Sequence, residues 1–267
     1  MLDVRQWHNT MKLDIYLQTH SVISVHGAHR YVNAPKSEVM LRCAQSLVTS
    51  INQAEGDIAL TVMDDHSSPE CVETLKKILA KCRYPVTLIE LEGRGYNASA
   101  LASFSRAREH GREIVYFVED DYLHAPGAIQ EMLDAYRLFK TNLGGREVAL
   151  FPMDYPDRYT SQPIEETRIV YGPKRHWRTV LHSTNTSWMD VGLIRKNWKL
   201  FESLALYSST PFGEQNNIYE ETTINAIWRE QAVLFSPIPS LALHLQHEEQ
   251  RDPYIDWKAW WDAAQYE

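Results

Sequence analysis

Five consecutive apolar residues, Ile114 to Val118, are followed at once by three acidic residues, Glu119, Asp120 and Asp121. A short apolar run rich in β-branched and aromatic residues predicts a strand covered on both faces, as in a parallel sheet. Ligands gather outside the carboxyl ends of such strands, where these acids would lie. Adjacent carboxylates raise one another's pKa unless a cation lies among them, and Mg²⁺ and Mn²⁺ prefer oxygen ligands. The stretch therefore predicts a divalent metal site, and a solvated acidic turn is the alternative.

A strand followed by a helix recurs along the first half of the chain. Strands are predicted at 13–17, 58–63, 86–91 and 114–118, and helices from an N-cap at Ser37, from Pro69, from Ala98 and from Pro126. This alternation predicts an α/β fold in which helices flank a parallel sheet. Later strands are predicted at 148–151, 169–171, 177–181, 233–235 and 241–245, and later helices at 191–204 and 219–229. We expect this second half to complete the same sheet.

Composition limits the classes of protein to which the chain can belong. Its 267 residues suit one large α/β domain, and 27 basic against 35 acidic residues argue against a general nucleic-acid partner. The three cysteines show no metal-binding spacing, which predicts reduced thiols. Residues 1–9 are too polar for a secretory leader, and no apolar run has the length of a membrane span. These features predict a cytoplasmic protein.

The last residues, 251–267, contain Trp257, Trp260 and Trp261. We expect this Trp-rich tail to pack back on the domain. The alternative is a docking surface for peripheral contact with a membrane or for a partner enzyme.

Two further turns contain residues suited to nucleotide binding. The second strand ends in Met63-Asp64-Asp65-His66-Ser67-Ser68, where Asp64 or Asp65 could accept hydrogen bonds from a base or a ribose hydroxyl. The alternative is capping of the helix that begins at Pro69. The third strand is followed by Gly93-Arg94-Gly95-Tyr96-Asn97, whose glycines let the backbone approach a ligand closely. Arg94 would then contact a base or a phosphate, and an exposed surface arginine is the alternative.

In order and spacing, these turns and the acidic stretch followed by Pro126 resemble the nucleotide-sugar half of GT-A glycosyltransferases, closest to the family 2 pattern, over residues 13–135. The resemblance implies a Rossmann-like, mostly parallel sheet flanked by helices in a single domain over 1–267. Residues 13–143 would bind the donor, and residues 144–250 would form the acceptor and catalytic half. Two positions depart from the pattern. His66 stands where the family usually has glycine, and Gln18-Thr19-His20 replaces a Pro/Tyr/Asn-type turn.

The resemblance also implies roles for particular residues. The residues expected to bind the donor are Thr19, Asp64, Asp65, Arg94, Asn97 and Asp120. Those expected to bind the metal are Asp121, Glu119 and His244. The catalytic base would be Glu221, paired with Glu220, because Tyr219-Glu220-Glu221-Thr222-Thr223-Ile224 matches the family's Glu-Asp pair with a side chain one methylene longer. Simple charge placement in a first helical turn is the alternative. For the acceptor, composition and position suggest Asp154, Tyr155, Arg158 and Trp188, because sugar faces stack on aromatic rings.

Together these features predict a metal-dependent, inverting glycosyltransferase of the hexosyl- or deoxyhexosyltransferase type. It would move a sugar from a UDP-, dTDP- or GDP-linked donor to a hydroxyl of a glycan or other acceptor, in glycan or polysaccharide synthesis, with Mn²⁺ or Mg²⁺ as cofactor. A sugar-phosphate nucleotidyltransferase would need a glycine-rich loop with a basic residue after the first strand, and residues 18–27 offer none. An aspartyl phosphohydrolase would need Asp-x-Asp at the same place. A non-catalytic nucleotide- or sugar-binding module would keep Asp64 and Asp121 but would not need Glu221.

Overall fold

The computed structural model describes residues 11–22, 32–160, 166–204, 220 and 223–266. Nine strands form one mixed sheet in the order β3-β2-β1-β4-β9-β6-β10-β8-β7, and β5 and β11 form a second, two-stranded sheet. The strands are β1 Lys12–Thr19, β2 Asp57–Asp64, β3 Val86–Glu90, β4 Ile114–Val118, β5 Tyr122–His124, β6 Glu147–Leu150, β7 Ile169–Tyr171, β8 His176–Val180, β9 Ser187–Asp190, β10 Ala232–Ile238 and β11 Ala242–His244. The helices are α1 Lys36–Asn52, α2 Pro69–Leu79, α3 Tyr96–His110, α4 Ala128–Asn142, α5 Val191–Lys196, α6 Trp198–Leu204, α7 Ile224–Glu230 and α8 Trp257–Ala263.

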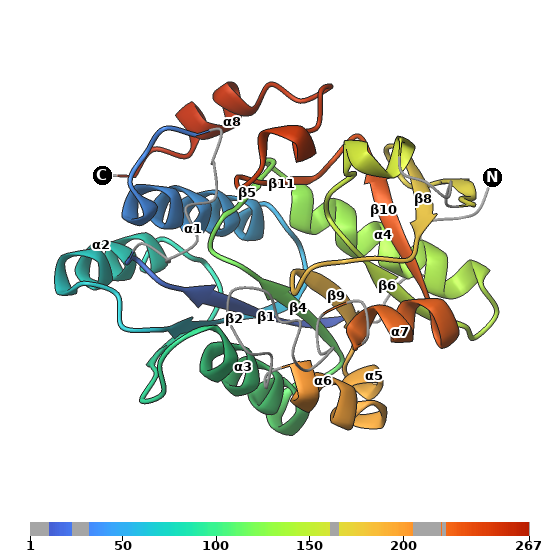
Figure 1. Ribbon diagram of the computed structural model, residues 1–267, viewed down its shortest axis with the longest axis horizontal. Coiled ribbons are helices and arrows are strands. Elements are labelled where there is room, and N and C mark those ends of the chain that lie inside the picture. Colours follow the sequence, from blue (N-terminus) through green and yellow to red (C-terminus); the bar gives the residue numbers. More distant parts are fainter. Residues whose placement is uncertain (1–10, 23–31, 161–165, 205–219, 221–222, 267) are drawn as a thin grey trace.

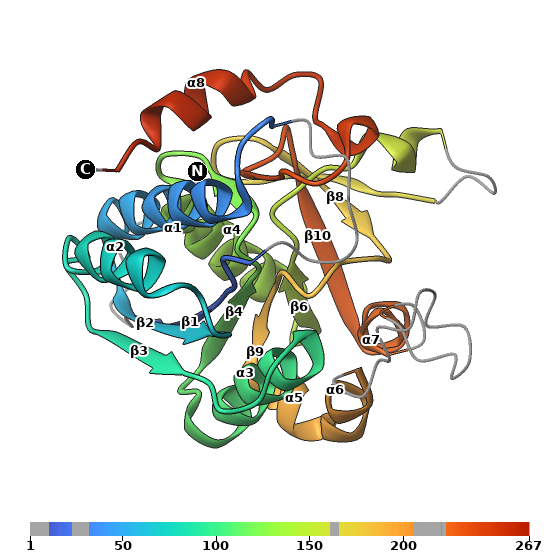
Figure 2. The same cartoon turned by 60° about the vertical axis from the view of Figure 1, so that its left-hand side comes forward.

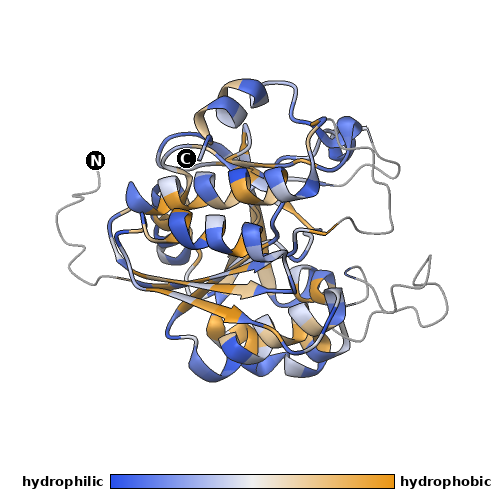
Figure 3. Ribbon diagram, turned by 90° about the vertical axis from the view of Figure 1, so that its left-hand side faces the viewer, coloured by the Kyte–Doolittle hydropathy of each residue, from blue (hydrophilic) through white to orange (hydrophobic). Residues whose placement is uncertain are grey.

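The first four strands are parallel neighbours, with β1 between β2 and β4. Helices α1, α2 and α4 cover one face of the large sheet, and α3, α5 and α6 cover the other (Figures 1 and 2). Every residue of β4 is therefore buried, as the apolar run predicts. Figure 3 shows the same layering as hydrophobic strands between helices that are hydrophilic on their outer sides.

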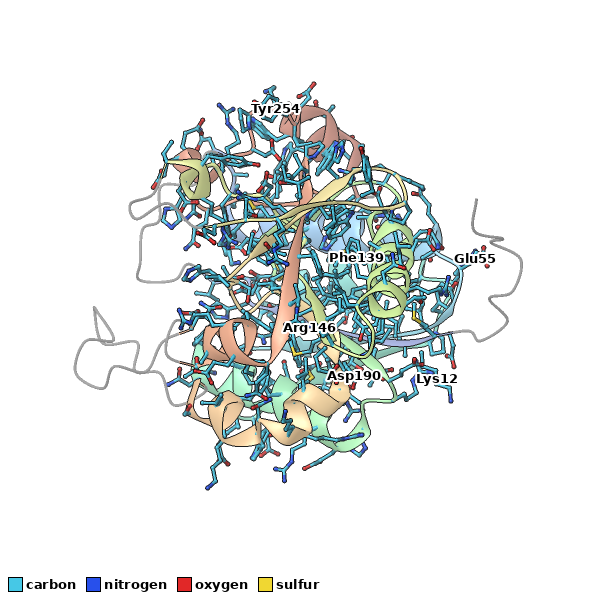
Figure 4. The ribbon with its side chains drawn as sticks, turned by 90° about the vertical axis from the view of Figure 1, so that its right-hand side faces the viewer. Lys12, Glu55, Phe139, Arg146, Asp190 and Tyr254 are labelled. Atoms are coloured by element: carbon cyan, nitrogen blue, oxygen red, sulfur yellow. The ribbon has the colours of Figure 1, made fainter. Side chains whose placement is uncertain are left out.

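Strand β9 joins the two parts of the sheet, since it pairs antiparallel with both β4 and β6. Strand β10 lies parallel to β6, and β7 and β8 form an antiparallel hairpin at the far edge of the sheet. Phe139 of α4, labelled in Figure 4, packs against this part of the sheet, with its ring 4.4 Å from that of Phe235.

Several predicted boundaries are wrong for local reasons. Helix α1 begins at Lys36 after Pro35, so Ser37 is not its N-cap. Helix α4 begins only after Gly127, whose φ is 73°. The helix predicted at 191–204 is two helices that meet at Asn197, and α7 begins at Ile224 rather than near 219.

The Trp-rich tail packs back on the molecule, as predicted (Figure 1). Arg42 of α1 donates a hydrogen bond to the backbone oxygen of Trp261 at 2.7 Å, and its guanidinium lies 4.5 Å from the Trp261 ring centroid. Contact of the tail with a membrane or a partner enzyme stays a prediction, as does the cytoplasmic location. Among the described residues, no helix combines the length and the hydrophobicity of a membrane span. Cys43, Cys71 and Cys82 are free thiols.

Candidate active site

The acidic residues lie where β4 ends and β5 begins. Strand β11 pairs antiparallel with β5 so that His244 lies opposite Tyr122. This pairing brings the His244 Nε2 atom to 3.4 Å from Asp121 Oδ1. The Tyr122 and His244 rings stack with centroids 4.7 Å apart, which fixes the plane of the imidazole. Two of the predicted metal ligands, far apart in the sequence, are thus side by side.

Glu119 directly follows β4, and two hydroxyl groups donate hydrogen bonds to its carboxylate. Its Oε2 atom accepts hydrogen bonds from Thr184 Oγ1 at 3.0 Å and from Thr186 Oγ1 at 3.1 Å. Burial, followed by the charge of Asp121, raises the pKa of Glu119 to about 7. Negative charge is therefore costly here, and an added cation would be stabilised.

His244 and Asp121 are side chains of the two types, imidazole and carboxylate, that coordinate divalent transition-metal ions. Burial lowers the pKa of His244, but the charges of Asp121 and Glu119 outweigh burial, and the net shift is upward. Mg²⁺ and Mn²⁺ sites commonly use one or two carboxylates together with substrate phosphates, and imidazole is also a suitable ligand for transition metals. Within the described ranges, no group of three or more His, Cys, Asp or Glu side chains is placed to hold an ion by itself. The residues present fit a divalent cation that a diphosphate and water help to coordinate.

Asp120 points to a different set of partners. It forms a buried ion pair with Lys36, and its Oδ2 atom accepts the backbone N–H of His20 at 2.7 Å. This carboxylate, which was predicted to bind the donor, therefore connects the end of β1 and the start of α1 to the acidic residues.

The aspartates at the end of β2 hold the surrounding turns. Asp64 accepts from Thr19 Oγ1 at 2.8 Å and from the backbone N–H of Ser67 at 3.0 Å. Asp65 accepts the backbone N–H of Gly95 at 2.7 Å, which ties the glycine-containing turn to β2. Neither aspartate caps α2, because Ser68 is its N-cap.

His66 adopts a φ of 58°. This left-handed conformation favours glycine, which explains why the family pattern has glycine there. The histidine is accommodated with its Nδ1 atom 2.9 Å from Asp65 Oδ1.

The turn before α3 is exposed. Gly95 is the N-cap at a φ of 89°, and Arg94 is exposed. The buried Oδ1 atom of Asn97 has no hydrogen-bond partner in the described part of the protein. A buried acceptor without a partner is uncommon. Asn97 lies in the first turn of α3, and the free N–H groups of a helix N-terminus favour anions.

Glu220 lies close enough to Glu119 for its charge to affect that carboxyl group. Tyr96 donates from its hydroxyl to Glu220 Oε1 at 3.4 Å and accepts from the Asn185 amide. The charge of Glu220 contributes to the raised pKa of Glu119. Glu220 precedes α7 and is not part of its first turn, so charge placement in that turn does not explain it. Glu221 lies outside the described residues.

The residues predicted to bind an acceptor separate into different environments. Asp154 forms a 2.7 Å ion pair with Arg178, and Arg158 donates to the backbone oxygen of His182. Tyr155 is buried, with its hydroxyl 3.1 Å from His244 Nδ1. Trp188 is 0% exposed, so it is a core residue that an acceptor cannot reach. The prediction that Trp188 binds an acceptor is therefore wrong.

Several residues of this site were not predicted from the sequence. They are Lys36, Tyr96, Thr184, Asn185 and Thr186. One signal was present, because a run of small polar residues at 183–187 directly precedes apolar residues of β9. Such a run beside a buried strand indicates hydroxyl groups directed at buried partners.

A cavity of about 300 Å³ lies elsewhere. Its lining includes Arg146, labelled in Figure 4, together with Ala232 and Val233 at the start of β10. Because β10 is parallel to β6, and β9 runs antiparallel to both β6 and β4, this cavity lies at the opposite edge of the sheet from the acidic residues.

Comparisons with known proteins agree with this architecture. No curated protein matches the sequence. The crystal structure of S. aureus TarS is 15% identical with a TM-score of 0.50, over 85% of this chain and 36% of TarS. The structure of S. aureus TarS 1–349 is 14% identical with a TM-score of 0.50, over 85% of this chain and 60% of that one. This chain thus spans less than two thirds of either structure, and the likeness concerns the fold.

The model of the family described as glycosyl transferase family 2 matches residues 33–198, more than half of the chain. This range includes the aspartate turn at 63–68, the glycine turn at 93–97 and the acidic residues after β4. The expected GT-A fold and the resemblance to family 2 are confirmed. The chain therefore belongs to glycosyltransferase family 2.

Proposed function

We propose that the protein transfers a sugar from a nucleoside diphosphate donor, UDP-, dTDP- or GDP-linked, to a hydroxyl of a glycan or other acceptor. The observation that supports this most directly is the pairing of Asp121 with His244 at the carboxyl end of β4, beside a glutamate whose pKa is raised to about 7. A site that resists negative charge in this way suits a ligand that arrives with a divalent cation.

Asp121 and His244, with Glu119 beside them, would hold Mn²⁺ or Mg²⁺. When bound, the cation would offset the negative charge that develops on the departing diphosphate. Asp64, Asp65, Arg94 and Asn97 would orient the nucleoside, with Thr19 and Asp120 supporting this side of the site.

Glu221, with Glu220 beside it, would act as general base. The acceptor oxygen would attack the anomeric carbon from the face opposite the diphosphate, so the configuration inverts. A carbon–oxygen bond to the acceptor forms, the bond to the diphosphate oxygen breaks, and the acceptor's proton passes to the carboxylate.

The test measures release of nucleoside diphosphate from a panel of nucleotide sugars, with and without Mn²⁺. We expect turnover with one donor class, and loss of turnover but not of donor binding in Glu221→Gln. Titration calorimetry supplies the binding measurement. Tight donor binding without any turnover, in the wild-type protein and with every acceptor tried, would indicate a non-catalytic binding module instead.

A further inference from the structure

A continuous path of contacts connects Glu119 to Asp121 through buried and partly buried side chains. In order, the residues are Glu119, Thr184, Tyr122, Tyr155, His244 and Asp121. The hydroxyl of Tyr122 lies 2.8 Å from Thr184 Oγ1 and 3.1 Å from the hydroxyl of Tyr155. The Tyr155 hydroxyl lies 3.1 Å from His244 Nδ1. Three hydroxyl groups thus separate a carboxylate from the imidazole.

Each of these hydroxyl groups has a single proton, which fixes the direction of the hydrogen bonds. Thr184 donates to Glu119, so its oxygen must accept from Tyr122. Tyr122 has then used its proton, and its oxygen must accept from Tyr155. The Tyr155 oxygen can in turn only accept from His244, so the proton of that contact belongs to Nδ1.

The backbone N–H of Thr186 supports this direction, because it also donates to Thr184 Oγ1, at 3.2 Å. Glu119 Oε2 receives a second hydroxyl proton from Thr186 Oγ1, so it acts as the acceptor that ends the path.

We propose that Tyr155 is a positioning residue that holds His244 with its proton on Nδ1, so that Nε2 presents a lone pair beside Asp121 to a divalent cation. This inference rests on the proposed function and assigns to Tyr155 a role that differs from acceptor binding. Tyr155 is 5% exposed, so it reaches the reaction only through His244. A ligating histidine generally needs a partner for its other nitrogen, and here a phenol oxygen takes the place of the more usual carboxylate or carbonyl.

The chain contains a matched control. The buried hydroxyl of Tyr116 lies 2.9 Å from His124 Nε2, and His124 Nδ1 lies 3.0 Å from the backbone oxygen of Tyr122. The histidine of this second contact belongs to the same pair of strands, since His124 of β5 lies opposite Ala242 of β11. Tyr116→Phe therefore removes the same kind of buried hydrogen bond as Tyr155→Phe, without touching His244.

The experiment titrates the metal-free full-length protein with Mn²⁺ in the presence of UDP and measures bound Mn²⁺ by electron paramagnetic resonance. We expect Tyr155→Phe to bind Mn²⁺ about 10- to 100-fold more weakly, the range typical of lost partners of metal ligands. Tyr116→Phe should bind it as the wild type does. Urea unfolding of both variants shows whether they lose comparable stability.

A second measurement needs no variant. In wild-type protein labelled with ¹⁵N-histidine and loaded with Mg²⁺ and UDP, the His244 resonances should show a protonated Nδ1 and an unprotonated Nε2. A proton on Nε2 instead would overturn the inference.

Wild-type protein that binds no Mn²⁺ would contradict the metal in the proposed function, and this inference with it. Wild-type binding that Tyr155→Phe leaves unchanged would contradict the inference alone.

Discussion

Lys36 and Asp120 form a buried ion pair that connects the first turn of α1 to the acidic residues after β4. A lysine is unfavourable at the positive end of a helix dipole. The carboxylate of Asp120 therefore compensates both the buried charge of Lys36 and its unfavourable interaction with the dipole of α1. Burial raises the pKa of Asp120, and Lys36 opposes that rise without cancelling it. The pair makes the placement of the candidate site depend on α1, a contact between distant parts of the sequence.

Lys36→Met should destabilise the protein by about 3–5 kcal/mol, because it leaves the Asp120 carboxylate buried without its cation. The double variant Lys36→Met with Asp120→Asn should lose less, since no buried charge then remains. Urea unfolding monitored by circular dichroism gives both values. Equal losses in the two variants would show that the buried charge is not the cause.

Asp121→Asn should lower kcat about 10³-fold if the residue holds the cation, because several kcal/mol of charge stabilisation in the transition state are lost. Asp14→Asn is the matched control. Asp14 is also a buried aspartate in an ion pair, with Arg112 at 2.8 Å, but it lies near the opposite end of β1. The Asp14→Asn variant should be less stable than the wild type and should have the same kcat. Equal kcat for wild type and Asp121→Asn would remove the metal role of Asp121.

Gly95→Ala should weaken donor binding. Gly95 has a φ of 89° and a ψ of 169°, a conformation that costs an L-residue about 1–3 kcal/mol, and its N–H donates a hydrogen bond to Asp65. Gly145→Ala provides the comparison, because Gly145 also has a φ of 89° and, like Gly95, open space at its Cβ position. Both variants should lose similar stability, and only Gly95→Ala should raise the donor KM. A raised KM in both would point to a general loss of structure.

The contribution of His124 to stability should fall below neutral pH. Burial lowers the pKa of His124 to about 4, whereas the unfolded chain has a pKa of about 6.5. The unfolded state therefore takes up the proton first, and stability is complete above pH 6.5 and decreases as the pH falls towards 4. The loss reaches about 3 kcal/mol. His124→Gln should be less sensitive to pH between 7 and 4.5 in urea unfolding, and an unchanged slope would contradict the prediction.

The sequence alone determined the features that depend on local pattern. The apolar run of β4 predicted a strand buried on both faces because neighbouring side chains alternate between the two faces of a sheet. The Pro69 signal for α2 succeeded because proline is favoured in a first turn. The order of the aspartate turn, the glycine turn and the acidic stretch was sufficient to indicate the family from the sequence, because each of them follows the end of a strand.

Only the tertiary structure decided which polar groups meet. Asp121 reaches His244 through the pairing of β5 with β11, and no local pattern encodes that register. Asp120, predicted to bind the donor, has an internal partner in Lys36, and Trp188, predicted to bind the acceptor, lies in the core. A carboxylate or an aromatic ring has the same letter in the sequence whether it faces a ligand or the interior. Its environment is set by strands and helices that are distant along the chain, and this is why Thr184 and Tyr155 could be given their places only in three dimensions.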